Sequence, residues 1–298
     1  MKKIQEYITF FTPEYIYIPF DKQELLNINK DMKLLHNWYL GTRENGTKIF
    51  SPVSGSIIGT KILSYPDHDG PGLVVENDFI DKREKLNSTR NMNKLKKSEI
   101  ISSLEKYGLS KKINSKTTLV VNSLYDKKYD LKDMVINYES YEEILEAIDE
   151  FLDIFNMKNC YICIDKNDVV STSSYEKYIN AFLNICIVHS NRKFKNDKCV
   201  FYSIEEILAI HKAIHLDYMY DNTIITINNG NTFVVKVKVY SSLLEVLKAL
   251  KIPFKSKLIL VDNKQVNIYN FIIDNTVRSV IIKDKLWYMY LLVKILIY

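Results

Sequence analysis

Two histidines stand at a spacing that is typical of metal sites on helices. His211 and His215 are four residues apart in a segment with helical periodicity, so we expect both rings on one helix face. The residues between them include no glutamate of the kind that zinc proteases use as a general base, and no third ligand is evident nearby in the sequence. The sequence therefore predicts partly buried helix histidines and no metal site.

The cysteines give a second pattern with possible metal chemistry. Cys160 and Cys163 have the Cys-x-x-Cys spacing of zinc and iron–sulfur ligands. The residues between them, Tyr and Ile, favour a strand, in which side chains three positions apart point to opposite faces. Cys186 falls in another predicted strand and Cys199 in a predicted loop. We therefore expect buried cysteines without a metal, and four cysteines in 298 residues do not indicate a disulfide scaffold.

A lysine-rich segment at 106–116 is a candidate anion site. It lies between a predicted helix that begins at Ser98 and a predicted strand at 117–123. Its candidate residues are Lys106, Gly108, Lys111, Lys112 and Lys116. These lysines could bind an anion weakly, but we expect them to be solvated, because an exposed charge run usually is.

The turn cluster at 65–72 brings together Asp67, His68 and Asp69. Metal binding or catalysis is conceivable with these side chains. Aspartate and glycine are also the residues that a tight turn requires. The sequence therefore predicts a turn between two strands at this position.

Local patterns indicate the elements that would position these side chains. The region 15–78 consists of short β runs and turns, and 117–123, 160–164 and 185–189 are typical of buried strands. A strand, a helix and a second strand in this order imply a parallel pair with a right-handed crossover. Capping-box pairs, serine followed three residues later by glutamate, predict helix starts at Ser140, Ser203 and Ser242. Asn229-Gly230 between alternating strands predicts a hairpin.

These elements predict an α+β protein in several parts. In chain order we expect a β module of the barrel-sandwich type at 12–80, a polar linker at 81–97, a Rossmann-like α/β core at 98–215, a β-grasp domain at 216–285 and an apolar tail at 286–298.

Composition excludes several classes of function. The chain holds only 8 glycines and no GxGxxG or GxxxxGK[ST] motif, which disfavours nucleotide sites of those types. The net charge of +5 is modest, and the basic run at 81–97 lacks aromatic residues for base stacking, so we expect no nucleic-acid partner.

The tail at 286–298 is too short to span a bilayer, and the N-terminus lacks a signal-peptide pattern. A cytoplasmic protein is expected.

Several phrases of the sequence resemble one known family in colinear order. The phrases are "YIYIPF" (15–20), "IFSPVSGSIIG" (49–59), "TTLVVNS" (117–123), "EEILEAIDEFLDIFNMKNCYICIDKND" (142–168), "EEILAIHKAI" (205–214) and "VRSVIIKD" (277–284). Over roughly residues 15–285 the chain resembles RnfC, the peripheral subunit of the Rnf electron-transport complex, and its relative PrdC of proline reductase systems. The resemblance implies a barrel-sandwich module, a core like that of the flavoprotein subunit of respiratory complex I, and a soluble-ligand-binding β-grasp (SLBB) domain.

The departures from this family concern its cofactors. The family members use FMN and [4Fe–4S] clusters, and the resemblance places their glycine-rich phosphate loop at 106–116, where this chain has one glycine. The family has an acidic phrase after the next strand, and this chain has a different sequence there, at 124–129. No cysteine motif that binds an iron–sulfur cluster is present. We therefore expect no cofactor of its own and transfer no catalytic residue from the family.

Three hypotheses for the function follow. The first is an RnfC-like or PrdC-like subunit that is not catalytic by itself and docks to other subunits of a redox complex, in the cytoplasm or at the inner face of the membrane through those subunits. The second is a module that binds or senses a small ligand through the β-grasp domain and the vacated cleft. The third is an enzyme that keeps a flavin through an altered loop, which the low glycine count disfavours.

Overall fold

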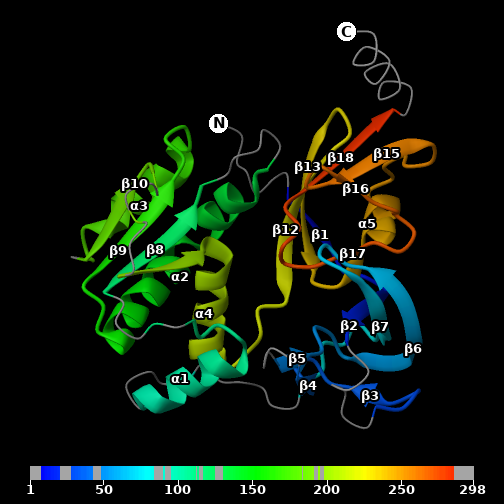
Figure 1. The fold of residues 1–298 in the computed structure, drawn as a ribbon, viewed down its shortest axis with the longest axis horizontal. Helices are drawn as coiled ribbons and strands as arrows, with labels where there is room; N and C mark the ends of the chain where they lie inside the picture. Colours follow the sequence, from blue (N-terminus) through cyan, green and yellow to red (C-terminus); the bar gives the residue numbers. More distant parts are fainter. Residues whose placement is uncertain are drawn as a thin grey trace.

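The computed structural model describes residues 8–20, 28–42, 48–83, 90, 95–111, 113, 117–124, 130–182, 184–190, 194 and 198–284. The chain is an α+β protein, and 27% of the residues that the structure describes are in helices and 38% in strands. Figure 1 shows an α/β part, in green, beside a β-rich part in which the blue N-terminal strands lie among the orange and red C-terminal strands. The predicted tail at 286–298 and most of the predicted linker lie outside the described residues.

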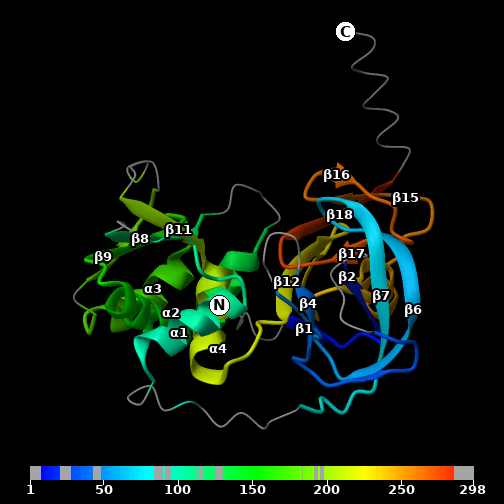
Figure 2. The ribbon, with the colours of Figure 1, turned by 60° about the horizontal axis from the view of Figure 1, so that its bottom comes forward.

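The α/β part is built on a parallel sheet. Its strands are β8 (Thr118–Ser123), β9 (Asn159–Ile164), β10 (Ile185–Val188) and β11 (Cys199–Ser203), in the spatial order β10-β9-β8-β11. All neighbouring pairs are parallel, as the strand–helix–strand pattern predicts. Figure 2 shows the helices on the same side of this sheet, where their apolar side chains form a large core with one face of the strands.

The helices of this part are α1 (Lys97–Lys106), α2 (Lys132–Phe155), α3 (Val169–Ile179) and α4 (Ile204–Leu216). Ser140 has non-helical φ and ψ and forms a kink between two helical segments of α2, so a segment begins there as predicted, but the preceding segment from Lys132 was not predicted. The start of α4 is confirmed: Ser203 Oγ accepts from the Glu206 N–H, and the Glu206 carboxylate accepts from the Ser203 N–H. Helices α2 and α4 pack against each other, which brings residues about 65 positions apart side by side.

The first β-rich sheet contains strands from both ends of the chain. Its order is β1 (Ile8–Phe11), β13 (Thr232–Lys238), β12 (Asn222–Asn228), β18 (Ser279–Asp284), β15 (Lys257–Val261) and β16 (Lys264–Gln265). The predicted hairpin at Asn229-Gly230 is confirmed between β12 and β13, and Gly230 adopts a φ of +105° that favours glycine. Helix α5 (Leu243–Ala249) begins after Ser242, as predicted, and contributes to the core of this sheet.

The second β-rich sheet is likewise shared. Its order is β17 (Ile272–Ile273), β14 (Ser241–Ser242), β2 (Tyr15–Pro19), β7 (Asp69–Asn77), β6 (Gly55–Ser64) and β3 (Lys33–Leu34), and β4 (Tyr39–Thr42) pairs with β5 (Lys48–Phe50) nearby. Gly55 opens β6 where a Cβ atom would lie 1.9 Å from the Glu76 carbonyl oxygen, so the Ser-Pro-Val-Ser-Gly corner requires glycine at this position.

Strand pairing therefore joins the regions predicted as 12–80 and 216–285, because β14 of the second region pairs with β2 of the first. Strand β1, which precedes both regions, pairs with β13 in the sheet of the C-terminal region. In the described part of the chain, no helix combines the length and the apolar character that a bilayer span requires.

Candidate functional site

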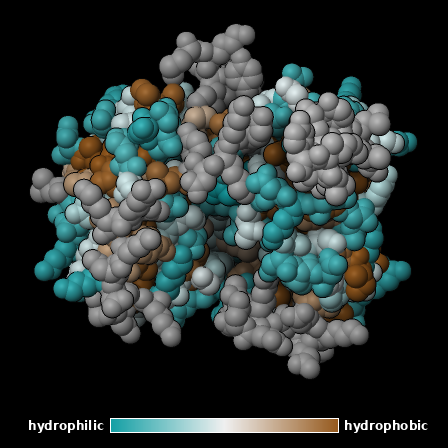
Figure 3. Space-filling view, turned by 45° about the horizontal axis from the view of Figure 1, so that its top comes forward, coloured by the Kyte–Doolittle hydropathy of each residue, from teal (hydrophilic) through white to brown (hydrophobic). Residues whose placement is uncertain are grey.

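A cavity of about 490 Å³ lies where the α/β part meets the two β-rich sheets. Its lining comes from β5, from the residues after α1, from the start of α4 and from the C-terminal sheets: Phe50, Tyr107, Gly108, Glu205, Tyr240 and Arg278 are representative. Ser203 at the carboxyl end of β11 also lines it. In α/β sheets, ligands bind outside the carboxyl ends of the strands, so this cavity is the candidate site. Figure 3 shows predominantly hydrophilic side chains on both halves of the molecule.

A buried ion pair forms one wall of the cavity. The ammonium group of Lys132, whose side chain is 2% exposed, lies 2.7 Å from the Glu205 carboxylate. It also donates to the Thr223 hydroxyl at 2.8 Å and to the Asn275 carbonyl at 2.6 Å. Burial raises the pKa of Glu205, and the neighbouring Lys132 opposes this rise. Lys132 thereby joins α2 and α4 to the C-terminal part of the chain.

A second charged group lies at the start of α2. Arg278 of the C-terminal part lies 2.8 Å from the Asp133 carboxylate and donates to Asp130 through Nε. Burial raises the pKa of Asp133, while Arg278 opposes the rise. Burial opposes the charge on Arg278 as well, but Asp133 and Asp130 raise the pKa of the guanidinium above its usual range. Each buried charge in this group has a counter-charge, as burial requires.

The lysines of the predicted anion segment have acidic partners. Lys106 lies 3.3 Å from Asp217 and 4.9 Å from the centre of the Tyr107 ring. Lys111 lies 2.8 Å from the Glu206 carboxylate and donates to the Phe201 carbonyl. Both lysines thus pair with carboxylates while keeping contact with solvent, and Lys112 and Lys116 lie outside the described residues.

The cavity does not fit the phosphate of a flavin. Asp133, Glu205 and Glu206 line it, and their carboxylates would repel a phosphate dianion. A helix N-terminus can bind phosphate through free N–H groups. At α4, however, the Glu206 N–H already donates to the Ser203 hydroxyl, and the Gly108 N–H donates to the Glu105 carbonyl. These two donors are thus occupied by the chain itself.

Cys160 and Cys163 lie on opposite faces of the sheet, as the alternation of side chains along a strand predicts, but the prediction for Cys199 is wrong. Cys160 packs into the core beneath the helices, whereas Cys163 packs with Cys199 and Val120 on the other face of the sheet. Burial raises the pKa of the Cys163 thiol to about 11. Cys186 is exposed, and all four cysteines are free. The loop prediction for Cys199 is wrong, since this residue is buried and begins β11.

The remaining predicted side chains separate into a turn and a helix cluster. Asp67 and His68 form the turn between β6 and β7, as expected, with His68 Nδ1 2.6 Å from the Asp67 carboxylate at the surface. His211 and His215 are both buried on α4, where they meet two glutamates of α2. Burial lowers the pKa of His211. The expectation that no third ligand lies nearby is therefore wrong in three dimensions.

Sequence reasoning also missed a buried cluster around His36. His36 Nε2 lies 2.5 Å from the Asp221 carboxylate, and the Lys238 ammonium lies 2.6 Å from the same carboxylate. Burial alone would raise the pKa of Asp221, but His36 and Lys238 hold it below its usual value. The partners are about 185 positions apart along the chain, and only tertiary packing brings them together. The cluster ties the N-terminal module to the segment between α4 and β12.

Comparison with known proteins adds no assignment. No protein-family model matches the chain, and a search of the curated proteins finds no significant match.

Proposed function

We propose that the protein is an RnfC-like or PrdC-like subunit, or an accessory protein, of an electron-transfer system, and that it acts by docking to redox partners. The resemblance of the sequence supports this proposal. The order of elements is compatible with it: β strands and turns come first, then a parallel α/β sheet, then a hairpin, a helix and further strands. On this proposal the protein works in the cytoplasm or is held at the inner face of the membrane by its partner subunits.

The occupied donors at the cavity carry the proposal that the subunit holds no flavin. A flavin-bearing relative needs free donors for a phosphate at this position, whereas this chain presents the carboxylates of Asp133, Glu205 and Glu206 beside Lys48 and Arg278. Lys106 and Lys111 pair with carboxylates of the same chain. A protein of this kind would transfer no electrons itself and would serve as a scaffold for subunits that do.

The first test is an absorbance spectrum of the purified protein before and after incubation with FMN and dialysis. We expect no band above the protein absorption in either sample. A retained flavin band, or the brown colour of an iron–sulfur cluster, would contradict the proposal.

The second test addresses docking. A tagged copy is expressed in the cell that encodes it, and the co-purifying proteins are identified and quantified. We expect flavin-bearing or iron–sulfur subunits of a redox complex in stoichiometric amounts. If the protein purifies alone from mild extracts in which such complexes stay intact, docking is refuted.

The cavity itself favours a second candidate function, the binding or sensing of a small polar ligand. Its volume of about 490 Å³ is in the range of small-molecule sites, and its lining mixes tyrosines with charges of both signs. A thermal-shift screen against amino acids, polyamines and small carboxylates tests this. Saturable stabilisation that is weakened in Lys48→Ala, a change at the exposed rim, would favour ligand binding. No shift with any compound would leave docking as the better proposal.

A further inference from the structure

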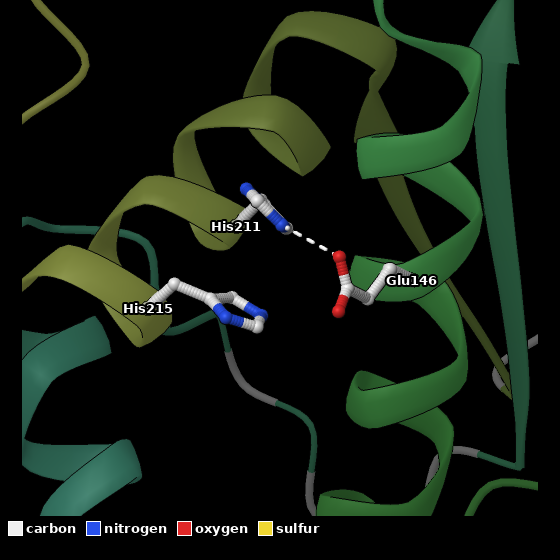
Figure 4. A group of neighbouring side chains, drawn as sticks. All are labelled: Glu146, His211 and His215. Carbon is white, nitrogen blue, oxygen red and sulfur yellow. Dashed lines mark hydrogen bonds and ion pairs between the residues drawn. The ribbon is translucent and has the colours of Figure 1, made fainter. Parts of the chain in front are cut away.

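Helices α2 and α4 place two pairs of potential metal ligands opposite each other. Glu146 and Glu150 are four residues apart on α2, and His211 and His215 are four residues apart on α4. Figure 4 shows both imidazole rings directed from α4 toward the Glu146 carboxylate on α2. The spacing puts each pair on one face of its helix, so four ligand-bearing side chains converge on one stretch of the helix interface.

The distances between these groups are those of a compact site. His211 Nε2 lies 3.1 Å from Glu146 Oε2, and His215 Nε2 lies 3.0 Å from Glu150 Oε2. The two rings are stacked with centroids 4.2 Å apart, and ligand atoms of Glu146, His211 and His215 all lie within 4.8 Å of one another. Ligands of a tetrahedral zinc ion, bound at about 2.0–2.2 Å, lie about 3.3–3.5 Å apart. Small side-chain rotations would therefore complete such a site.

The two histidines are buried beside an exposed carboxylate. His211 is 9% exposed, and its Nε2 atom is the ring nitrogen that faces Glu146. Figure 4 shows the other nitrogen of His211 on the far side of the ring, so Nε2 is the atom that would bind an ion next to Glu146. The Glu146 side chain is 56% exposed, so an ion can reach the group from solvent along this edge of the helix pair.

The local charge also favours a divalent cation. Glu143, Glu146 and Glu150 contribute three carboxylates, and Lys212 contributes one ammonium, which lies 3.0 Å from Glu143. These four side chains together carry an excess of two negative charges. Two imidazoles with one or two carboxylates form a ligand set that suits zinc and similar transition metals.

We propose that Glu146, His211 and His215 bind a divalent transition-metal ion, with zinc as the best-fitting ion, and that Glu150 is the fourth ligand. The site joins α2 to α4 at the surface of the α/β part. It is separate from the cavity described above and does not depend on the proposed function. The competing explanation is that the two histidine–glutamate pairs only hold the helices together.

The test uses the full chain, with any histidine tag removed and metals stripped by EDTA. Zn²⁺ is titrated by calorimetry, and Co²⁺ is added separately because tetrahedral Co²⁺ gives visible absorption bands. We expect one ion per chain and Co²⁺ bands typical of nitrogen and oxygen ligands. Cys186→Ser serves as the background, because it removes the exposed thiol as a competing ligand.

Three variants separate metal binding from a structural role. We expect His211→Gln/His215→Gln to abolish binding and Glu146→Gln to weaken it at least about tenfold, while His68→Gln, a surface histidine beside Asp67, leaves it unchanged. Circular dichroism in EDTA checks that each variant is folded. If the stripped wild type binds no stoichiometric Zn²⁺, or if a folded His211→Gln/His215→Gln variant binds it as well as the wild type, the proposal is wrong.

Discussion

Helices α2 and α4 form two charged clusters with each other, and the two differ in how far their charged groups are exposed to solvent. At the beginning of the helices, Lys132 and Glu205 are buried, and Lys132 also donates to a hydroxyl and a backbone carbonyl. Farther along, His211 and His215 are buried but Glu146 is largely exposed. We call these the closed cluster and the open cluster.

The difference indicates separate roles for the two clusters. A buried ion pair contributes little net stability compared with apolar packing, but removing one partner is costly. The closed cluster therefore holds the α/β part against the C-terminal part of the chain. The open cluster combines the accessible Glu146 carboxylate with two buried imidazoles, so an ion from solvent can reach all three ligand groups.

The largest effect is expected from breaking the closed cluster. Lys132→Met removes the ammonium and leaves Glu205 buried without its counter-charge. We expect a loss of about 3–5 kcal/mol in the free energy of unfolding, measured by urea denaturation. The control is Lys132→Met/Glu205→Leu, which should recover part of the loss. A loss below about 1 kcal/mol is typical of surface ion pairs and would show that Lys132 and Glu205 do not behave as a buried pair.

Zinc should have the next largest effect if the open cluster binds it. Ligand that binds only the folded chain, at a concentration 100 times the dissociation constant, raises the free energy of unfolding by about 2.7 kcal/mol. We expect this stabilisation in the stripped wild type and in Lys132→Met, because the two clusters do not share side chains. Glu146→Gln, which we expect to bind at least about tenfold more weakly, should lose about half of it or more, and equal stabilisation of Glu146→Gln would contradict the assignment.

The pH dependence of Lys132→Met gives a third test. Burial already raises the pKa of Glu205, and Lys132 opposes this rise, so the variant should have a still higher pKa at Glu205. A carboxyl group whose pKa is raised in the folded state favours folding when it is protonated. The free energy of unfolding therefore falls as the pH rises from the unfolded-state pKa toward the folded-state pKa. The deficit of the variant should therefore grow with pH above about 4.3, by at most about 1.4 kcal/mol per pH unit. The double variant with Glu205→Leu should lack this growth.

The smallest change in the free energy of unfolding is expected from an ion pair that lies between the two clusters. Lys212 and Glu143 form a partly exposed pair on the same helices, with 3.0 Å between their charged atoms. We expect Lys212→Met to change the free energy of unfolding by less than about 1 kcal/mol, measured by the same denaturation. A loss as large as that of Lys132→Met would show that position along the helices, and not burial, decides the cost.

Features set by neighbouring residues could be predicted from the sequence. Ser203 and Glu206 begin α4 through groups three residues apart, and Asn229-Gly230 closes a hairpin between adjacent strands. The alternation that separates Cys160 from Cys163 is equally local. At Ser140 the same pattern marks the kink between two helical segments of α2, but the segment that begins at Lys132 was not predicted, because local propensity is only a weak guide to helix position.

The sequence by itself determined the α+β class, most helix and strand positions, and the spacing of His211 and His215. Only the tertiary structure decided that Glu146 faces those histidines, that Lys132 meets Glu205 and that β1 joins β13 at the other end of the chain. Local patterns depend on groups within about four residues, where backbone geometry fixes the neighbours. Charge partners and strand partners depend on how the apolar faces pack, and that packing involves the whole chain at once.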